Sequence, residues 1–175
     1  EFLRGFKIVN GEYFINEKIA AGKKVLAEGA QGSMLDVDFG TFPFVTSSNT
    51  ISAGVCTGLG IAPQKIGEVF GITKAYCTRV GSGPFPTELH DDMGELLRKT
   101  GNEFGSTTGR PRRCGWIDLV ALHFACMING VTQIIMTKTD ILDNIDNLQV
   151  CNSYSIDGKE TDQVPFQMNH LNISP

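Results

Sequence analysis

The most chemically suggestive stretch of the sequence is GSTTGRPRRCGW, which occupies residues 105–116. It places Arg110, Arg112 and Arg113 after two threonines and two glycines, and just before a strongly apolar segment. Glycine lets backbone N–H groups converge on an anion, threonine adds hydroxyl donors, and a guanidinium binds a carboxylate or phosphate through two parallel hydrogen bonds. The stretch therefore fits a site for a small dianion. A solvated basic turn is the alternative that composition leaves open.

A second candidate site is TKTD, residues 137–140, which follows a short apolar run. The carboxylate of Asp140 can accept hydrogen bonds from both N1–H and the exocyclic amino group of guanine. The aliphatic stem of Lys138 can lie over the same ring. Adenine lacks this pair of donors, so the pattern favours guanine. A surface turn with one salt bridge is the alternative reading.

Two polar stretches could contact a phosphorylated ligand. In EGAQG, Gln31 stands between small residues directly after a predicted strand, where an amide can stabilise an oxygen that gains charge during a reaction. In VTSSNT, residues 45–50, hydroxyl and amide groups could bind a phosphate at a helix start, or simply cap that helix. A structural turn and a helix cap are the respective alternatives.

Composition limits the class of protein. The chain has 175 residues and a formal net charge of -4, which argues against a general nucleic-acid binder because such binding depends on many Lys and Arg residues. Its five cysteines include no CxxC pair, which favours a reduced, cytoplasmic protein without a zinc site. No apolar run approaches the roughly 20 residues of a membrane span. We therefore expect no nucleic-acid and no membrane partner.

Hydrophobic periodicity and capping residues predict alternating helices and strands. Two predicted helices begin near Glu12 and Asn49, and two more cover residues 90–100 and 115–130. The predicted strands cover residues 25–27, 68–80, 134–136 and 148–156, and a turn is predicted at Asp157 and Gly158. The helix over 115–130 is apolar nearly all round, so we expect it to be buried, as we do the strands over 25–27 and 134–136.

This order of elements predicts an α/β fold with parallel strand pairing, in which ligands gather where strands end. The length suits one domain over residues 1–175, with the polar residues 145–175 forming an edge segment.

Four ordered blocks resemble the adenylosuccinate synthetase family. The blocks are EGAQGSMLDVDFGTFPFVTSSNT, TRVGSGPFPTEL, GNEFGSTTGRPRRCGWIDLVAL and TKTDILD. They lie between residues 25 and 143, and their length and order make the resemblance specific. The family joins aspartate to IMP at the expense of GTP, through a 6-phosphoryl-IMP intermediate. The resemblance implies a central, mostly parallel sheet with flanking helices, distantly like that of P-loop GTPases.

The resemblance assigns roles to individual residues. Gln31 is expected to act catalytically at the 6-oxygen of IMP, Thr46 to bind its 5′-phosphate and Val80 to face its ribose. The residues expected to bind aspartate are Ser106, Thr107, Thr108, Gly109, Arg110 and Arg112. Arg110 is also expected to reach IMP and Arg112 to touch GTP. Lys138, Thr139 and Asp140 are expected to bind the guanine base of GTP.

The resemblance also implies partners and missing parts. Magnesium is expected with GTP, as is a cytoplasmic homodimer, but no glycine-rich phosphate loop of the GDEGKGK type occurs in the sequence. The chain lacks an initial Met and resembles only the family's central part, so we expect an inactive piece of a longer enzyme, with metal ligands mostly elsewhere. Thr139 and Pro111 depart from residues that are usual in the family.

One alternative of a different class stays open at this point. In a non-catalytic guanine-nucleotide-binding module, TKTD would read guanine while the arginine stretch gripped an acidic partner. A phosphate-gripping nucleic-acid module is a third reading, and the acidic charge balance opposes it.

Overall fold

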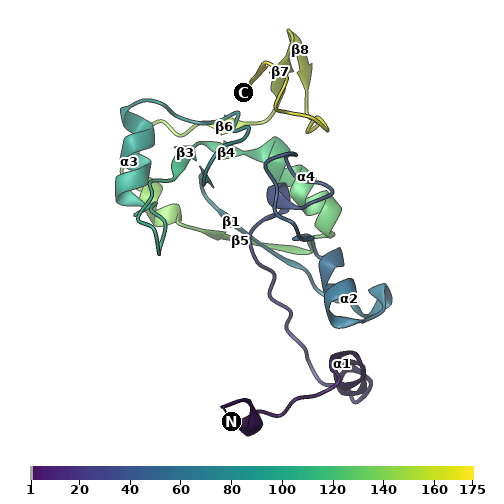
Figure 1. Ribbon diagram of the computed structural model, residues 1–175. Helices are drawn as coiled ribbons and strands as arrows, with labels where there is room; N and C mark the ends of the chain where they lie inside the picture. Colours follow the sequence, from purple (N-terminus) through teal and green to yellow (C-terminus); the bar gives the residue numbers. More distant parts are fainter. Residues whose placement is uncertain (1) are drawn as a thin grey trace.

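The computed structural model describes residues 2–175 of the chain (Figure 1). Short 3₁₀ helices are labelled η. In chain order the elements are η1 (Phe2–Gly5), α1 (Gly11–Ala20), η2 (Ser33–Leu35), α2 (Ala53–Leu59), η3 (Pro63–Lys65), β1 (Phe70–Lys74), β2 (Cys77–Arg79), α3 (Asp92–Thr100), β3 (Arg113–Gly115), β4 (Ile117–Asp118), α4 (Leu119–Asn129), β5 (Gln133–Thr137), η4 (Thr139–Leu142), β6 (Val150–Cys151), β7 (Tyr154–Ile156), β8 (Lys159–Thr161) and β9 (Ile173–Ser174).

The strands β1 and β5 form a parallel pair along their full lengths, from Phe70 opposite Gln133 to Lys74 opposite Thr137. Two helices, α3 and α4, lie between these strands in the sequence. The predicted α/β class with parallel pairing is therefore confirmed. Because parallel strands end on the same side, Lys74 and Thr137 stand together at the carboxyl end of the pair.

The prediction of one strand over residues 68–80 is wrong, because the chain bends at Ala75 and Tyr76 between β1 and β2. Both residues of the bend are buried, and Tyr76 is only 1% exposed. Beyond the bend, β2 leaves the parallel pair and runs antiparallel to β3, with Arg79 opposite Arg113. Because β3 follows the arginine-rich stretch directly, the bend brings that stretch toward the carboxyl end of β1.

Helices α3 and α4 begin at aspartate caps. The Oδ1 atom of Asp91 accepts a hydrogen bond from the backbone N–H of Gly94 at 3.1 Å. Asp118 does the same for Ala121 at 2.9 Å. These bonds satisfy donors that a helix start leaves free. The first residues of the helix predicted over 115–130 belong instead to β3 and β4, so α4 is shorter than expected.

Three predictions of burial are wrong in this structure. Leu26, within the predicted strand 25–27, is 88% exposed, and that segment forms no strand among residues 2–175. In β5, Ile135 is 47% exposed, and in α4 only Val120 is buried. The reason is shared: β1 and β5 form a two-stranded sheet, so the described residues supply too few neighbours to cover its apolar faces and edges.

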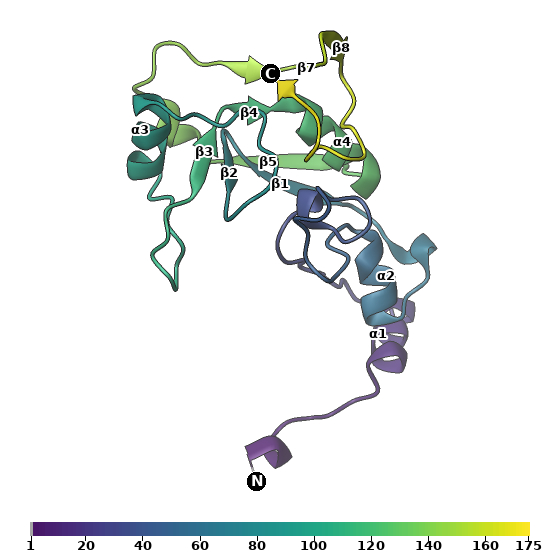
Figure 2. The same cartoon turned by 45° about the horizontal axis from the view of Figure 1, so that its top comes forward.

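Helix α1 stands apart from the sheet, and an extended stretch connects it to the rest of the chain (Figures 1 and 2). It touches α2, where the side-chain amide of Asn16 donates a hydrogen bond of 2.9 Å to the backbone oxygen of Gly60. Gly60 ends α2 with a φ of 66°, in the left-handed region that favours glycine. The helices predicted from Glu12 and Asn49 thus both exist, although α2 begins only at Ala53.

The strand predicted over residues 148–156 is divided into two. Its first part, β6, pairs in parallel with β4, and its second part, β7, pairs with β8 and β9. The predicted turn is confirmed: Asp157 and Gly158 both have positive φ, 51° and 78°, and join β7 to β8. Tyr154 ties this region to the main body through a hydrogen bond of 2.5 Å from its hydroxyl to Oδ2 of Asp118.

Two small clusters form the core. One consists of Val120, Cys151, Tyr154 and Met168, and the other of Tyr76, Leu97 and Cys114. Partly buried Ile141 and Leu142 of η4 pack on the second cluster, which therefore joins the bend after β1 to α3, β3 and η4. No helix within residues 2–175 is both long and apolar enough to cross a membrane.

Candidate functional site

The arginine loop, residues 105–112, is closed at its base by main-chain hydrogen bonds. The N–H of Gly105 donates to the carbonyl of Arg110, and the N–H of Gly109 donates to the carbonyl of Gly105, both at 2.8 Å. Gly109 has a φ of 64°, so the turn needs a residue that tolerates the left-handed region. The exposed residues of the turn are Ser106, Thr107, Thr108, Gly109 and Arg110. Five of the six residues predicted to bind aspartate therefore stand together on one preformed, solvent-facing turn.

Arg110 and Arg113 have opposite environments. The guanidinium of Arg110 makes no hydrogen bond or ion pair with any residue in the described part of the chain. Arg113 pairs with the carboxylate of Glu88 through Nε and Nη2, and its Nη1 donates to the carbonyls of Gly81 at 3.1 Å and Gly83 at 2.8 Å. Arg113 therefore holds a turn of the protein itself, whereas Arg110 is free to bind an anion.

Arg112 is fixed by its main chain and its side chain. Its N–H donates to the carbonyl of Glu103 at 3.0 Å, and its own carbonyl accepts from Nε of Arg98 at 2.8 Å. Its Nη1 donates to Oε2 of Glu103 at 2.7 Å. Its Nε is buried without a hydrogen-bond partner among residues 2–175. The predicted contact of Arg112 with aspartate and GTP would therefore come from a guanidinium that already has one defined partner.

Glu103 is a buried carboxylate at the centre of a cationic cluster. The residue is 1% exposed, and its Oε1 accepts hydrogen bonds of 2.7 Å from Nζ of Lys74 and from the hydroxyl of Tyr76. Burial raises the pKa of Glu103, but the donors on Lys74, Tyr76 and Arg112 outweigh it, so the pKa lies below its ordinary value of 4.5. The carboxylate is therefore ionised at neutral pH and holds two cations close to each other.

Lys138, the predicted guanine-stacking residue, lies beside this cluster. It adopts a φ of 62° immediately before η4, and its Nζ donates a hydrogen bond of 2.7 Å to the carbonyl of Gly101, which ends α3. Thr139 and Asp140 are exposed, and the carboxylate of Asp140 has no hydrogen-bond partner among the described residues. The acceptor predicted to read guanine is thus accessible to a ligand.

Gln31 lies on a strained turn just before η2. It is exposed and has a φ of 66°, which is uncommon for a residue with a side chain. The turn is anchored by Asn129 at the end of α4, whose Nδ2 donates to the hydroxyl of Ser33 at 2.9 Å. The Oδ1 of Asn129 accepts from the N–H of Ser52 at 2.8 Å. One side chain therefore fixes both ends of residues 33–52, a segment that contains Thr46 and begins two residues after Gln31.

Asp36 organises the interior of the same excursion. It is fully buried, and its two carboxylate oxygens accept four backbone N–H groups, from Asp38, Phe39, Thr50 and Ile51. Burial raises the pKa of Asp36, but these four donors hold it below its ordinary value of 3.8. Thr46 is half-buried within this loop, and its N–H donates to the carbonyl of Leu35 at 2.8 Å.

Val80 is 63% exposed and follows β2 directly. Its neighbour Arg79 donates from Nη2 to Oγ1 of Thr41 at 3.0 Å and to the carbonyl of Phe44 at 3.2 Å. Arg79 therefore ties the segment that precedes Thr46 to the end of β2, next to Val80. The segments that contain two of the four residues predicted to contact IMP are thus connected through one side chain.

The predicted residues thus form two groups in the structure. The arginine loop and Lys138 meet around Glu103, at the carboxyl ends of β1 and β5. Arg79 joins the segment before Thr46 to the end of β2 next to Val80, and Asn129 anchors Ser33, just after Gln31.

Sequence reasoning missed the residues that hold these groups in place. They are Asp36, Lys74, Tyr76, Arg79, Glu103 and Asn129. The available signal was one acidic residue, Glu103, placed a few positions before a run of arginines. Nothing in the sequence shows that Lys74 or Tyr76 would meet it, because that contact depends on the bend after β1.

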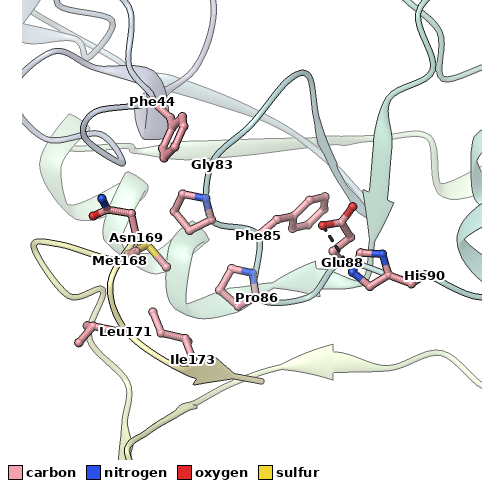
Figure 3. Close-up of a pocket in the computed structure, with 11 residues that line it drawn as sticks. Phe44, Gly83, Phe85, Pro86, Glu88, His90, Met168, Asn169, Leu171 and Ile173 are labelled. Atoms are coloured by element: carbon pink, nitrogen blue, oxygen red, sulfur yellow. Dashed lines mark ion pairs between the residues drawn. The ribbon is translucent and has the colours of Figure 1, made fainter.

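One pocket borders the second of these groups, because its wall includes Phe44, whose carbonyl accepts a hydrogen bond from Arg79. It has a volume of about 570 Å³ and contains none of the predicted site residues; its walls are formed by Phe44, Gly83, Pro84, Phe85, Pro86, Glu88, His90, Met168, Asn169, Leu171 and Ile173. Figure 3 shows Met168 and Asn169 at one side of the pocket and the Glu88 and His90 pair at the other, with Phe85 and Pro86 between them. The predicted site residues therefore do not line this pocket.

Magnesium does not fit the described residues. Within residues 2–175, no group of three or more His, Cys, Asp or Glu side chains is placed to hold a metal ion. We therefore derive no chemical step through a metal from this chain.

The geometry defines an α/β fold with an arginine-rich turn and an exposed carboxylate, Asp140, next to η4, and comparison with known proteins gives its family. The family model for adenylosuccinate synthetase matches residues 3–175. The chain belongs to this family.

Individual relatives agree with the family model. The adenylosuccinate synthetase of Azobacteroides pseudotrichonymphae is 64% identical over 168 residues, which is 96% of this chain and 40% of that protein. The synthetase of Cytophaga hutchinsonii is 63% identical over 174 residues, which is 99% of this chain and 40% of that protein. This chain spans about 40% of the length of the curated relatives it matches.

A solved structure gives the same result in three dimensions. The fully ligated adenylosuccinate synthetase from Plasmodium falciparum superposes with a TM-score of 0.89 at 44% identity. The match covers 94% of this chain and 40% of that one. The bend after β1, the arginine loop and the β1–β5 pair therefore belong to a fold that the family shares.

Proposed function

We propose that a full-length protein containing this chain ligates L-aspartate to IMP with consumption of GTP and forms adenylosuccinate. The observation that carries the proposal is the closed arginine loop, in which the guanidinium of Arg110 is free at the base while Arg112 is held by Glu103. Lys138 is held close by through the carbonyl of Gly101. Family membership supports the same activity.

The proposed reaction has two steps. The γ-phosphoryl group of GTP is transferred to the 6-oxygen of IMP, which gives 6-phosphoryl-IMP and GDP. The amine of aspartate then attacks C6, the C6–N bond forms, and the bond between C6 and the 6-oxygen breaks as inorganic phosphate leaves. The ammonium group of aspartate loses two protons overall, and the product keeps one N–H. The second step needs aspartate held with its amine aimed at one carbon.

The arginine loop is suited to that task. Main-chain N–H groups and threonine hydroxyls on a closed turn can hold one carboxylate, and the guanidinium of Arg110 can hold another. Clamping both carboxylates fixes the orientation of the amine and lowers the entropy that is lost at the reacting centre. Arginine stays charged at any pH that the enzyme meets, which makes it a better clamp than lysine.

The nucleotide contacts follow from the same arrangement. Asp140, with its accessible carboxylate, accepts the two N–H donors of guanine while the stem of Lys138 covers the ring. Arg112, which is held by Glu103, also contacts GTP. On the IMP side, the amide of Gln31 supports the 6-oxygen as charge develops on it, Thr46 binds the 5′-phosphate and Val80 faces the ribose.

The proposal extends to the whole protein as follows. Residues 1–175 form part of one domain, the protein is a cytoplasmic homodimer, and magnesium reaches the site with GTP through ligands outside residues 2–175. The chain by itself binds nucleotide but does not complete the reaction, because its sequence contains no glycine-rich phosphate loop.

Ligand-observed NMR on this chain tests the binding half of the proposal. IMP, GDP, ADP and aspartate are offered separately to a folded sample whose intact mass has been checked. We expect signals of bound IMP and GDP and none for ADP. Equal binding of GDP and ADP would contradict guanine recognition by Asp140.

The same measurement separates the alternative function. The exposed carboxylate of Asp140 beside Lys138 also suits a non-catalytic guanine-nucleotide-binding module. Such a module would bind GDP and ignore both IMP and aspartate. Binding of IMP therefore favours the ligase over the module.

A further inference from the structure

We propose that Glu103 is a positioning residue for the ligation, which orients the guanidinium of Arg112 toward the segment that carries Lys138. Glu103 is not expected to touch a substrate, because it is 1% exposed and both of its oxygens already have protein partners. The inference rests on the proposed function, since it concerns how Arg112 is presented to aspartate and GTP.

The first argument is that Glu103 restricts the orientation of the Arg112 side chain more than packing alone would. The two residues share a main-chain hydrogen bond of 3.0 Å and a side-chain hydrogen bond of 2.7 Å. The second of these holds Nη1 and, together with the burial of Nε, restricts the positions that the guanidinium can take. A guanidinium with a fixed plane loses less entropy when it binds a carboxylate or phosphate.

The second argument is charge. Lys74 and Arg112 both lie 2.7 Å from oxygens of the Glu103 carboxylate. Without a negative charge between them, these two cations would repel each other in a poorly hydrated region. The carboxylate therefore allows Arg112 to stand near the carboxyl end of β1, where nucleotide contacts are expected, and leaves one net positive charge in the cluster.

The third argument is a connection to the guanine-reading segment. The hydroxyl of Tyr76 donates to Oε1 of Glu103, and Gly101 lies directly against that hydroxyl. The carbonyl of Gly101 accepts the hydrogen bond of 2.7 Å from Lys138. A continuous set of contacts thus runs from Lys138 through Gly101, Tyr76 and Glu103 to Arg112, so a shift of the carboxylate would displace the two ligand-binding segments relative to each other.

A double-mutant cycle in a full-length synthetase containing this chain tests the proposal. Glu103→Gln keeps the shape of the side chain but removes its charge and turns an amide N–H₂ toward existing donors. We expect the KM for aspartate to rise by about tenfold or more, with a smaller fall in kcat, because a charge-assisted hydrogen bond is typically worth that much. In an Arg112→Ala background, the same substitution should change the KM for aspartate by less than about twofold.

A role in folding alone would give a different result. In that case Glu103→Gln would lower the concentration of active enzyme, leave the KM for aspartate unchanged and act equally in both backgrounds. That outcome would overturn the proposal. If the Gln variant does not fold, Glu103→Asp replaces it, because Asp keeps the buried charge and withdraws the carboxylate from Arg112 by one methylene. The same loss of effect in the Arg112→Ala background is then expected.

Glu88→Gln is the matched control. Glu88 is a largely buried carboxylate that pairs with Arg113, the neighbour of Arg112 in the sequence, and shares no partner with Glu103. Its substitution should act on the KM for aspartate to the same extent with and without Arg112. Failure of the proposed function is recognised separately, because unsubstituted protein would then form no adenylosuccinate and the cycle could not be measured.

Discussion

Lys138 donates a hydrogen bond of 2.7 Å from its Nζ atom to the main-chain oxygen of Gly101, which links the turn after β5 to the end of α3. Gly101 in turn lies against Tyr76, whose hydroxyl bonds to the buried carboxylate of Glu103. The segment predicted to read guanine and the loop predicted to bind aspartate are therefore held by one group of contacts. Substitutions at different points of this group should have separable effects.

Gly101→Ala should destabilise the protein by about 1–3 kcal/mol, because added methyl groups in a packed region force their neighbours to move. A Cβ atom at residue 101 would overlap the hydroxyl of Tyr76 and would lie 2.8 Å from the carbonyl oxygen of Leu97. Urea unfolding measures the change. Gly58→Ala is the control, since its Cβ would meet nothing within 4 Å and alanine favours the helix α2. Equal loss of stability in both variants would contradict the close approach.

Arg110→Ala should raise the KM for aspartate by about tenfold to a hundredfold, since a hydrogen bond to a charged group contributes roughly 1.5–3 kcal/mol. Affinity for GTP should stay the same, because the guanidinium of Arg110 is exposed and is not bonded to the segment that carries Lys138 and Asp140. Steady-state kinetics of a full-length synthetase containing this chain give both values. Arg4→Ala, at an exposed arginine in η1, serves as the control. Equal losses for aspartate and GTP would contradict the assignment.

Asp140→Asn should reduce the preference for GTP over ATP by about tenfold or more, because the amide cannot accept both donors of guanine. The KM for aspartate should not change. Competition of GTP with ATP in the same assay measures the preference. Asp143→Asn removes another exposed carboxylate just after η4 and should leave it unaltered. A preference that survives in the Asp140 variant would show that another residue reads the base.

Stability should depend on acid through Glu103. Its pKa is lower in the folded protein than its ordinary value of 4.5, so its contribution is fully present above that value. The contribution is lost as the pH falls through the folded pKa. The gap in unfolding free energy between the unsubstituted protein and Glu103→Gln should therefore shrink from about pH 6 to about pH 3. Urea unfolding across that range measures it, and a gap that stays constant would mean that Glu103 is not ionised in the folded state.

Local features of the fold were predictable from the sequence. The Asp157–Gly158 turn acts over a few residues, and its prediction is confirmed. The aspartate caps of α3 and α4 are equally local, but they were not among the predictions. The bend at Tyr76 was not predictable in this way. Residues 68–80 have a continuous preference for strand, and the chain bends because Tyr76 is buried against α3 and β3, which are distant in the sequence.

The residues of the candidate site show the same difference between local and long-range signals. Arg110 and Asp140 were recognised because their types and neighbours suggest chemistry without tertiary structure. Glu103, Asn129 and Asp36 were missed because their importance lies in the partners that folding brings to them. Leu26 and Ile135 were predicted to be buried, which assumed neighbouring strands that residues 2–175 do not supply.

Formation of adenylosuccinate by a full-length protein containing this chain tests the proposed function most directly. Purified protein is given IMP, aspartate, GTP and magnesium, and the product is identified by its mass in reactions that each omit one component. The proposed ligation predicts product only when all three substrates are present, and much less product when ATP replaces GTP. A folded protein that binds GTP but forms no adenylosuccinate from the complete mixture would contradict it.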